Sequence, residues 1–150
     1  MIIRDIINMK GGAIFSIAPD GLVADAVSQM VKHDIGSLVV LDGGHMAGML
    51  TFREVLRALD AHGGNLAGLR VKSVMVAQPV CGGPDDTLEH LREVMTKNHV
   101  RYLPVKDGDK LLGVISFHDV AKAAIKETSF ENRLLKRYIE HQPPADKAAE

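Results

Sequence analysis

The 150-residue sequence has a composition that excludes several broad classes of protein. Hydrophobic residues make up 46% and charged residues 25%, with a formal net charge of −1, which is typical of a soluble globular protein. This near-neutral charge gives no electrostatic reason to expect nucleic acid or a membrane surface as a partner. A single cysteine, Cys81, cannot form a disulfide within the chain and fits a reducing cytoplasm. No apolar run approaches the ~20 residues of a membrane-spanning helix, and the charged residues Arg4 and Asp5 interrupt the apolar stretch that a signal peptide needs. We therefore expect a cytoplasmic protein.

The first half of the chain predicts a strand, a helix, a hairpin and a second helix. Apolar residues recur at helical spacing after the turn at 19–21, which indicates a helix with one buried face. Two short apolar runs on either side of an Asp-Gly-Gly sequence predict a hairpin. The expected elements are a strand at 13–17, a helix at 22–33, strands at 37–41 and 46–50, and a helix that begins at 52.

The second half repeats this order after a glycine-rich connector at 62–68. Its expected elements are a strand at 79–81, a helix at 87–98, strands at 102–105 and 110–115, and a helix that begins at 117. The last helix is longer than its counterpart, and Phe130, Leu134 and Tyr138 share one of its faces. Such an extra amphipathic helix predicts a docking surface. We expect the residues after 142 to be a disordered polar tail.

The two halves align without a gap when the chain is displaced by 65 residues. Residues 19–59 then match residues 84–124, with identity at twelve of 41 positions. A half of about 60 residues buries too little surface to be comfortable alone, so the halves are expected to share a core. This arrangement predicts a pseudo-twofold pair with clefts at the seam, where small ligands usually bind.

Each half carries the sequence pattern Gly-h-h-[Ser/Thr]-x-x-acid, in which h is a hydrophobic residue. It occurs at 48–54 and again at 113–119, after a Pro-Asp helix entry, an apolar strand and a glycine-containing turn in each half. On these motifs the chain resembles a tandem pair of CBS domains, the regulatory modules named for cystathionine β-synthase. The resemblance covers about residues 1–128.

The resemblance implies an α+β fold of two βαββα half-domains packed as a pseudo-twofold pair, with an extended C-terminal helix. We place the first CBS domain at 1–66, the second at 67–128, and the helix extension with its tail at 129–150. In this family the ligands are adenosine compounds such as AMP, ADP, ATP or NAD, and the pair is often a dimer. The chain is therefore expected to bind an adenine nucleotide and to form a homodimer.

The pair Ser116 and Asp119 has two interpretations. The spacing is that of a capping box, in which each residue satisfies a backbone amide at the start of a helix. The same carboxylate could accept hydrogen bonds from both hydroxyls of a ribose, which is the role that the resemblance implies. The two roles are compatible.

The first half departs from this pattern because Glu54 stands where the family has an aspartate. The extra methylene moves the carboxylate about 1.5 Å outward. Thr51 still matches the motif. Either the ribose sits differently in this cleft, or the cleft has lost its nucleotide.

The remaining candidate residues concern phosphate and adenine. Arginine forms a two-pronged contact with phosphate, which makes Arg53 and Arg101 candidates beside His118; each could equally be a solvated surface residue. The strand starts could line an apolar slot for adenine, although most of their residues would also suit a core. The candidates there are Phe15, Ser37, Pro79, Val80, Tyr102, Leu103 and Pro104.

The sequence therefore predicts a non-catalytic sensor that binds an adenine nucleotide between two CBS domains and signals energy or redox state to a partner. No nucleophile with a base, no metal-ligand spacing among the seven histidines and no catalytic cofactor motif is present. The alternative is a protein-interaction scaffold with unoccupied clefts, whose last helix binds a target enzyme or transporter.

Overall fold

The first half folds around one small sheet with the strand order β1-β2-β3. The computed structural model describes residues 1–141. Strand β1 runs parallel to β2, and β2 and β3 form an antiparallel hairpin. Strand β1 is shorter than the run predicted at 13–17, since residues 13–15 line a cleft instead of extending the strand. The elements are β1 (Ser16–Ile17), α2 (Val23–His33), β2 (Ser37–Asp42), β3 (His45–Thr51) and α3 (Phe52–Ala61).

The second half repeats this plan around a two-stranded sheet. The strand predicted at 79–81 is wrong: in its place one parallel bridge joins Gly82 to Val105. Pro79 has no amide hydrogen for a strand pairing, which is consistent with this loss. The elements are α4 (Leu88–Asn98), β4 (Tyr102–Asp107), β5 (Lys110–Ser116) and α5 (Phe117–His141). The α+β fold and the extended last helix are thus confirmed, whereas the tail predicted after residue 142 lies outside the described residues.

The repeat extends to individual backbone pairs. Ser37 lies opposite Thr51 in the first hairpin, and Tyr102 lies opposite Ser116 in the second, 65 residues later. Both hairpins also have an irregularity at the same place, after Val40 and after Val105. The two halves therefore share one backbone plan, and differences between their clefts arise from side chains and from the segments that precede each half.

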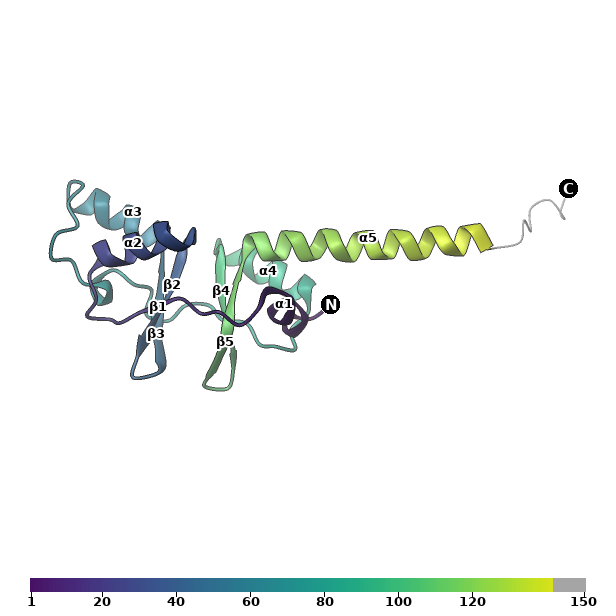
Figure 1. Ribbon diagram of the computed structural model, residues 1–150, viewed down its shortest axis with the longest axis horizontal. Helices are drawn as coiled ribbons and strands as arrows, with labels where there is room; N and C mark the ends of the chain where they lie inside the picture. The colour runs from purple at the N-terminus through teal and green to yellow at the C-terminus, as the bar shows by residue number, and fades with distance from the viewer. Residues whose placement is uncertain (142–150) are drawn as a thin grey trace, which may run out of the picture.

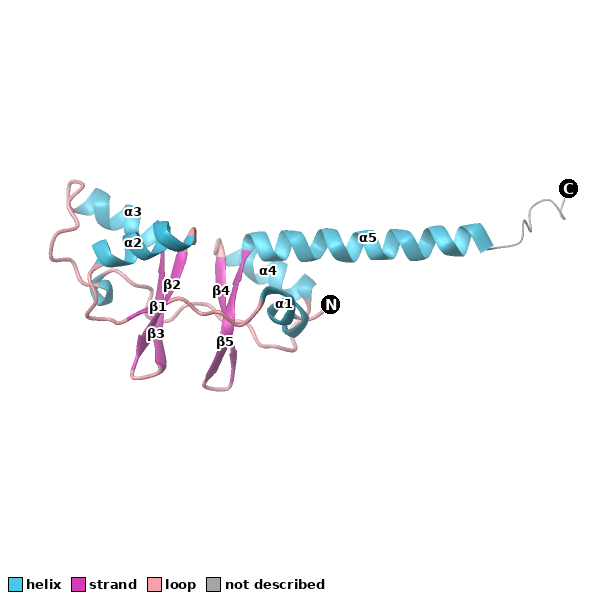
Figure 2. Ribbon diagram, viewed as in Figure 1, coloured by secondary structure: helices cyan, strands magenta, loops and turns pink. Residues whose placement is uncertain are grey.

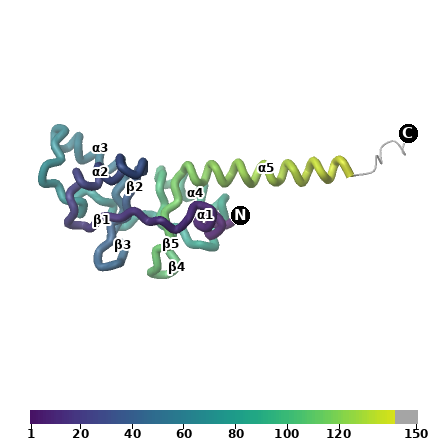
Figure 3. The backbone as a smooth tube through the Cα atoms, in the orientation of Figure 1, coloured from purple at the N-terminus to yellow at the C-terminus, as the bar shows by residue number. Residues whose placement is uncertain are grey.

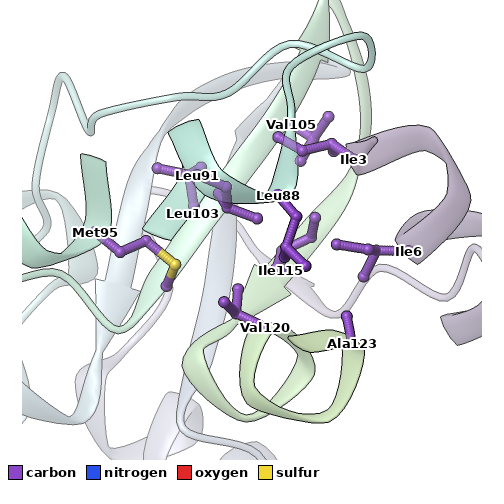
Figure 4. Close-up of a cluster of buried hydrophobic side chains, with 10 residues drawn as sticks. All are labelled: Ile3, Ile6, Leu88, Leu91, Met95, Leu103, Val105, Ile115, Val120 and Ala123. Carbon is purple, nitrogen blue, oxygen red and sulfur yellow. The ribbon is translucent and has the colours of Figure 1, made fainter. Parts of the chain in front are cut away.

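The segments that precede the two halves are exchanged between them. Helix α1 (Ile3–Lys10) packs on the second half, and Figure 4 shows Ile3 and Ile6 among the buried side chains of that core. The short helix η1 (Val71–Ser73) contributes Val71 to the core of the first half. After α1 the chain crosses back to the first half, as the purple trace in Figure 3 shows. The segment that precedes each half therefore completes the core of the other half. The domain boundary at 66/67 stays a prediction.

The two hairpins stand side by side between the helices of the first half and those of the second (Figure 1). Helices α2 and α3 cover the outer side of the first half, and α1 and α4 cover that of the second (Figure 2). Helix α5 begins in the second half and then extends well beyond it. Across residues 1–141 no helix combines the length and apolar character needed to cross a membrane.

Candidate functional site

Two clefts lie at the seam, and each is built around the start of one motif helix. The first cleft, next to the start of α3, has about 640 Å³ of empty space, and the second, next to the start of α5, has about 1370 Å³. Both are open to solvent. The lining of the first is Met49, Thr51, Phe52, Arg53, Glu54, Val76, Gln78, Pro79, Val80, Val100, Arg101 and Tyr102. The lining of the second is Lys10, Ala13, Ile14, Phe15, Asp34, Ile35, Gly36, Ser37, Val39, Arg101, Tyr102, Val114, Ser116, Phe117, His118 and Ala121.

In the second cleft the motif forms a complete capping box. The Ser116 amide donates to the Asp119 carboxylate at 2.8 Å, and the Asp119 amide donates to the Ser116 hydroxyl at 3.1 Å. The Lys10 ammonium donates to the same carboxylate oxygen at 2.6 Å and to the Val114 carbonyl at 2.8 Å. Lys10 and Ser116 both line the cleft, so Asp119 lies at its edge, held by two of its lining residues.

These contacts set the charge state of Asp119. Partial burial raises the pKa of its carboxyl, but the hydrogen bonds from Lys10 and Ser116 lower it by more, so that the pKa lies below the ordinary aspartate value. Asp119 is therefore ionised at neutral pH. The hydrogen bonds from Lys10 and from the Ser116 amide both end on Oδ2. Within residues 1–141 no hydrogen bond ends on Oδ1, which leaves this oxygen as an acceptor for a ligand hydroxyl.

In the first cleft the equivalent acid has different partners. Glu54 is only 8% exposed, and it accepts a short hydrogen bond from the Thr51 hydroxyl. No lysine or arginine among residues 1–141 lies within ion-pair distance of it. Arg53, which precedes it, donates to the His99 carbonyl at 2.9 Å, at the end of α4. The first cleft therefore has a buried acid held by a hydroxyl group where the second has an ion pair.

Arg101 and Tyr102 lie between the two clefts and line both. The Arg101 guanidinium carbon lies 5.6 Å from the centre of the Phe52 ring, a cation–π distance. Phe52 in turn meets the Tyr102 ring edge-on, with 6.3 Å between ring centres. Burial raises the pKa of the Tyr102 hydroxyl, partly offset by the positive charge of Arg101, so this hydroxyl keeps its proton at neutral pH.

The structure brings most of the predicted site residues to one of the clefts. Thr51, Arg53 and Glu54 meet Pro79 and Val80 in the first cleft. A second group meets in the second cleft: Phe15, Ser37, Ser116 and His118, with Asp119 at the edge, while Arg101 and Tyr102 belong to both.

Leu103 and Pro104 do not line either cleft. Leu103 is 1% exposed and belongs to the hydrophobic core of the second half, and Pro104 is buried beside it in β4. Side chains alternate along a strand, so Leu103 faces the opposite side of β4 from Tyr102. Pro104 shares the side of Tyr102 but lies further along the strand, where neither cleft reaches it. The sequence could not show how far along β4 the cleft extends.

Sequence reasoning missed Lys10, which gives the second cleft its cation. Lys10 is 109 residues from its partner Asp119, so no local spacing links the two. Gln78 in the first cleft was also missed. The one sequence feature that hints at Lys10 is its place directly before the Gly-Gly pair that ends α1. Within residues 1–141 no cluster of three histidine, cysteine or acidic residues could hold a metal ion.

The CBS domain family model matches residues 3–61 and again residues 71–126. The chain belongs to the CBS domain family. The CBS domain-containing protein YhcV of Bacillus subtilis is 29% identical over 129 residues, which are 86% of this chain and 90% of that protein. The crystal structure of the CBS-domain containing protein ATU1752 from Agrobacterium tumefaciens is 30% identical, with a TM-score of 0.79, and the match covers 82% of this chain and 92% of that one.

A more distant structure shares the fold. The CBS domain pair of protein MJ0100, in complex with 5'-methylthioadenosine and S-adenosyl-L-methionine, is 19% identical with a TM-score of 0.73, over 85% of this chain and 98% of that one. The family resemblance deduced from the two motifs is thus confirmed, and CBS pairs are regulatory modules.

Proposed function

We propose that this chain is a non-catalytic cytoplasmic sensor that binds an adenine nucleotide, AMP, ADP, ATP or NAD, in the clefts between its CBS domains. Binding would report the energy or redox state of the cell to a partner protein. A single observation carries the proposal: the second cleft places an ionised carboxylate, a helix start and basic side chains around one open space at the seam.

These groups match the parts of a nucleotide. Asp119 Oδ1 can accept a ribose hydroxyl, because the other carboxylate oxygen already holds Lys10 and the Ser116 amide. The start of α5 favours an anion, since the first turn of a helix has free amides and a positive dipole end. His118 in that turn and Arg101 across the seam supply the basic side chains for phosphate. The apolar side chains of Ile14 and Phe15 offer a surface for adenine.

The family supports this assignment by analogy. The MJ0100 pair holds two adenosine compounds, and its likeness to this chain at 19% identity shows a common fold.

A screen by thermal unfolding tests the proposal. Saturation at ~100 times Kd should stabilise the protein by about 2.7 kcal/mol. We expect this stabilisation with at least one of AMP, ADP, ATP and NAD, and none with CMP as the matched control for phosphate without adenine. If all four leave the melting temperature unchanged at millimolar concentration, the nucleotide proposal is wrong.

A second candidate function, an interaction scaffold, is favoured by the outer part of α5. This helix buries Val120 and Ala123 near its start. Further along, a set of large apolar side chains is exposed, among them Ile125 at 68% and Tyr138 at 64%: Ile125, Phe130, Leu134, Leu135, Tyr138 and Ile139. Large exposed apolar side chains gathered on one helix mark an interaction site.

We propose that a second copy of the chain occupies this surface and forms a homodimer. The homodimer would then bind a target enzyme or transporter. Light scattering on the full chain should give twice the monomer mass, and the double variant Leu134→Glu/Ile139→Glu should give the monomer mass. A monomeric wild type at ~100 μM would contradict the dimer. Dimerisation without nucleotide binding would favour the scaffold over the sensor.

A further inference from the structure

One arginine serves two clefts in this molecule. Arg101 lines both the first and the second cleft. The position that corresponds to it in the repeat, 65 residues earlier, is Gly36, which has no side chain. A strictly symmetric pair would place one basic residue at each of these positions. This pair of equivalent positions therefore supplies a single guanidinium where the symmetry provides for two.

The absence of a side chain at Gly36 makes room for Tyr102 at the seam. A Cβ atom there would lie 2.0 Å from the Tyr102 hydroxyl, so the tyrosine occupies the space that a side chain would need. Tyr102 thereby reaches from the second half into the wall of the second cleft, whose lining includes Gly36 and Ser37. Arg101 directly precedes β4 and lines both clefts.

The other long basic side chains of the clefts are already engaged. Arg53 in the first cleft donates to the His99 carbonyl, and Lys10 in the second donates to Asp119. Arg101 is exposed, and among residues 1–141 no carboxylate lies within ion-pair distance of it. Its guanidinium is therefore the cation that an incoming phosphate can recruit without breaking an existing hydrogen bond.

We propose that the two clefts compete for Arg101, so that a phosphorylated ligand in one cleft weakens the binding of a second one in the other. This rests on the proposed function and specifies how its two sites are coupled. One guanidinium neutralises one phosphate, and a second phosphate at the same seam adds a like charge without a second unengaged guanidinium. A nucleoside, which has no phosphate, is bound without this competition.

The chain offers a matched pair of variants to test the coupling. Arg53 and His118 occupy equivalent positions in the repeat, both exposed at the start of a motif helix. A glutamate at either position repels phosphate from one cleft and is tolerated by a helix start. Arg53→Glu thus leaves the second cleft for AMP, and His118→Glu leaves the first.

Calorimetric titration of AMP into the wild type and both variants measures the competition. The wild type should bind AMP with two Kd values. We expect the weaker Kd to be at least about fivefold higher than the Kd of the variant that keeps only the same cleft, and fivefold is the lower end of usual couplings between sites. In the background of Arg101→Gln this ratio should fall to one, and with adenosine it should be one throughout. If the wild type binds a single AMP while each variant binds one, the competition is complete and the proposal is again supported.

The results that would overturn the coupling differ from those that would overturn nucleotide binding. Two AMP molecules bound with a ratio of one, or a single AMP that is lost entirely in one variant and unaffected in the other, would overturn the sharing of Arg101 and leave nucleotide binding intact. Absence of both AMP and adenosine binding at millimolar concentration would overturn the proposed function itself, and the coupling with it. Circular dichroism of each variant establishes that it is folded before titration.

Discussion

The two motif helices begin with the same backbone arrangement, but the acids in their first turns have different partners. In the second half Asp119 forms a capping box with Ser116 and an ion pair with Lys10. In the first half Glu54 is buried against the Thr51 hydroxyl without a cation beside it. The duplicated backbone thus preserves the place of each acid but not the groups that compensate its charge.

The difference originates in the segments exchanged between the halves. The backbone of Val76 pairs with Met49 through two hydrogen bonds of 3.0 and 2.9 Å beside the first cleft. In the second half the carbonyl of Val114, which corresponds to Met49, accepts its hydrogen bond from the Lys10 side chain instead. A backbone pairing therefore borders the first cleft, and a lysine side chain takes the corresponding place in the second. This contrast predicts that the two respond differently to substitution.

The largest expected difference concerns the two motif glycines. A Cβ atom on Gly48 would lie 2.3 Å from the Val76 carbonyl oxygen, whereas one on Gly113 would meet the flexible end of Ile7 at 2.9 Å. Gly48→Ala should lower the free energy of unfolding by about 3 kcal/mol, and Gly113→Ala by about 1 kcal/mol. Urea denaturation of both variants measures this. Equal losses would mean that the backbone pairing beside the first cleft does not constrain it.

The loss of the lysine from the second cleft is expected to have the next largest effect. Lys10→Met should cost about 1 kcal/mol of stability at pH 7, because both side chains of the pair are partly buried. The pair holds the pKa of Asp119 below its ordinary value, so its stabilisation is present above about pH 4 and is lost as the pH falls through the pKa in the folded protein.

Denaturation of wild type and Lys10→Met at pH 7 and at ~pH 3 tests this dependence. The gap in stability should shrink in acid. Lys72→Met is the control, since its partner Asp20 is fully exposed and no measurable loss is expected. A gap that is the same at both pH values would show that Lys10 acts through packing and not through charge.

The smallest effect is expected from the variant Glu54→Asp, which restores the aspartate of the motif in the first half. In Glu54→Asp the shorter side chain can accept from the Thr51 amide, as Asp119 accepts from Ser116, and leave an oxygen free for a ribose. We expect AMP to bind the first cleft about threefold more tightly, measured by titration of Glu54→Asp in the His118→Glu background, a gain of roughly 0.6 kcal/mol. A weaker affinity would indicate that the longer acid suits this cleft.

Regular elements could be predicted from the sequence because their causes are local. Helices α2 and α4 follow the spacing of apolar residues, and the hairpins follow Asp-Gly turns at residues 42 and 107. The strands predicted at 13–17 and 79–81 were too long or wrong, because these segments line the clefts instead of completing a sheet. Their apolar residues suit either role.

The tertiary contacts of the site join residues that are far apart in the sequence, so no local pattern predicted them. Residues 3–7 fit the core of either half, and only packing assigns them to the second. That exchange brings Lys10 to Asp119, and Gly36 admits Tyr102 to the seam. The motif acids were predictable from the repeat, and Arg101 from the fit of a guanidinium to phosphate and from the family resemblance. The pairing of Asp119 and the burial of Leu103 required the structure.

Calorimetric titration with AMP of wild type, Asp119→Ala and Lys10→Met tests the nucleotide site most directly. Both variants lose the ion pair, but only Asp119→Ala loses the acceptor for ribose. Removal of a charged hydrogen-bonding group should weaken binding at the second cleft at least tenfold, about 1.4 kcal/mol, while Lys10→Met keeps a Kd within about threefold of the wild type. An Asp119→Ala variant that is folded and binds AMP as tightly as the wild type would contradict the account.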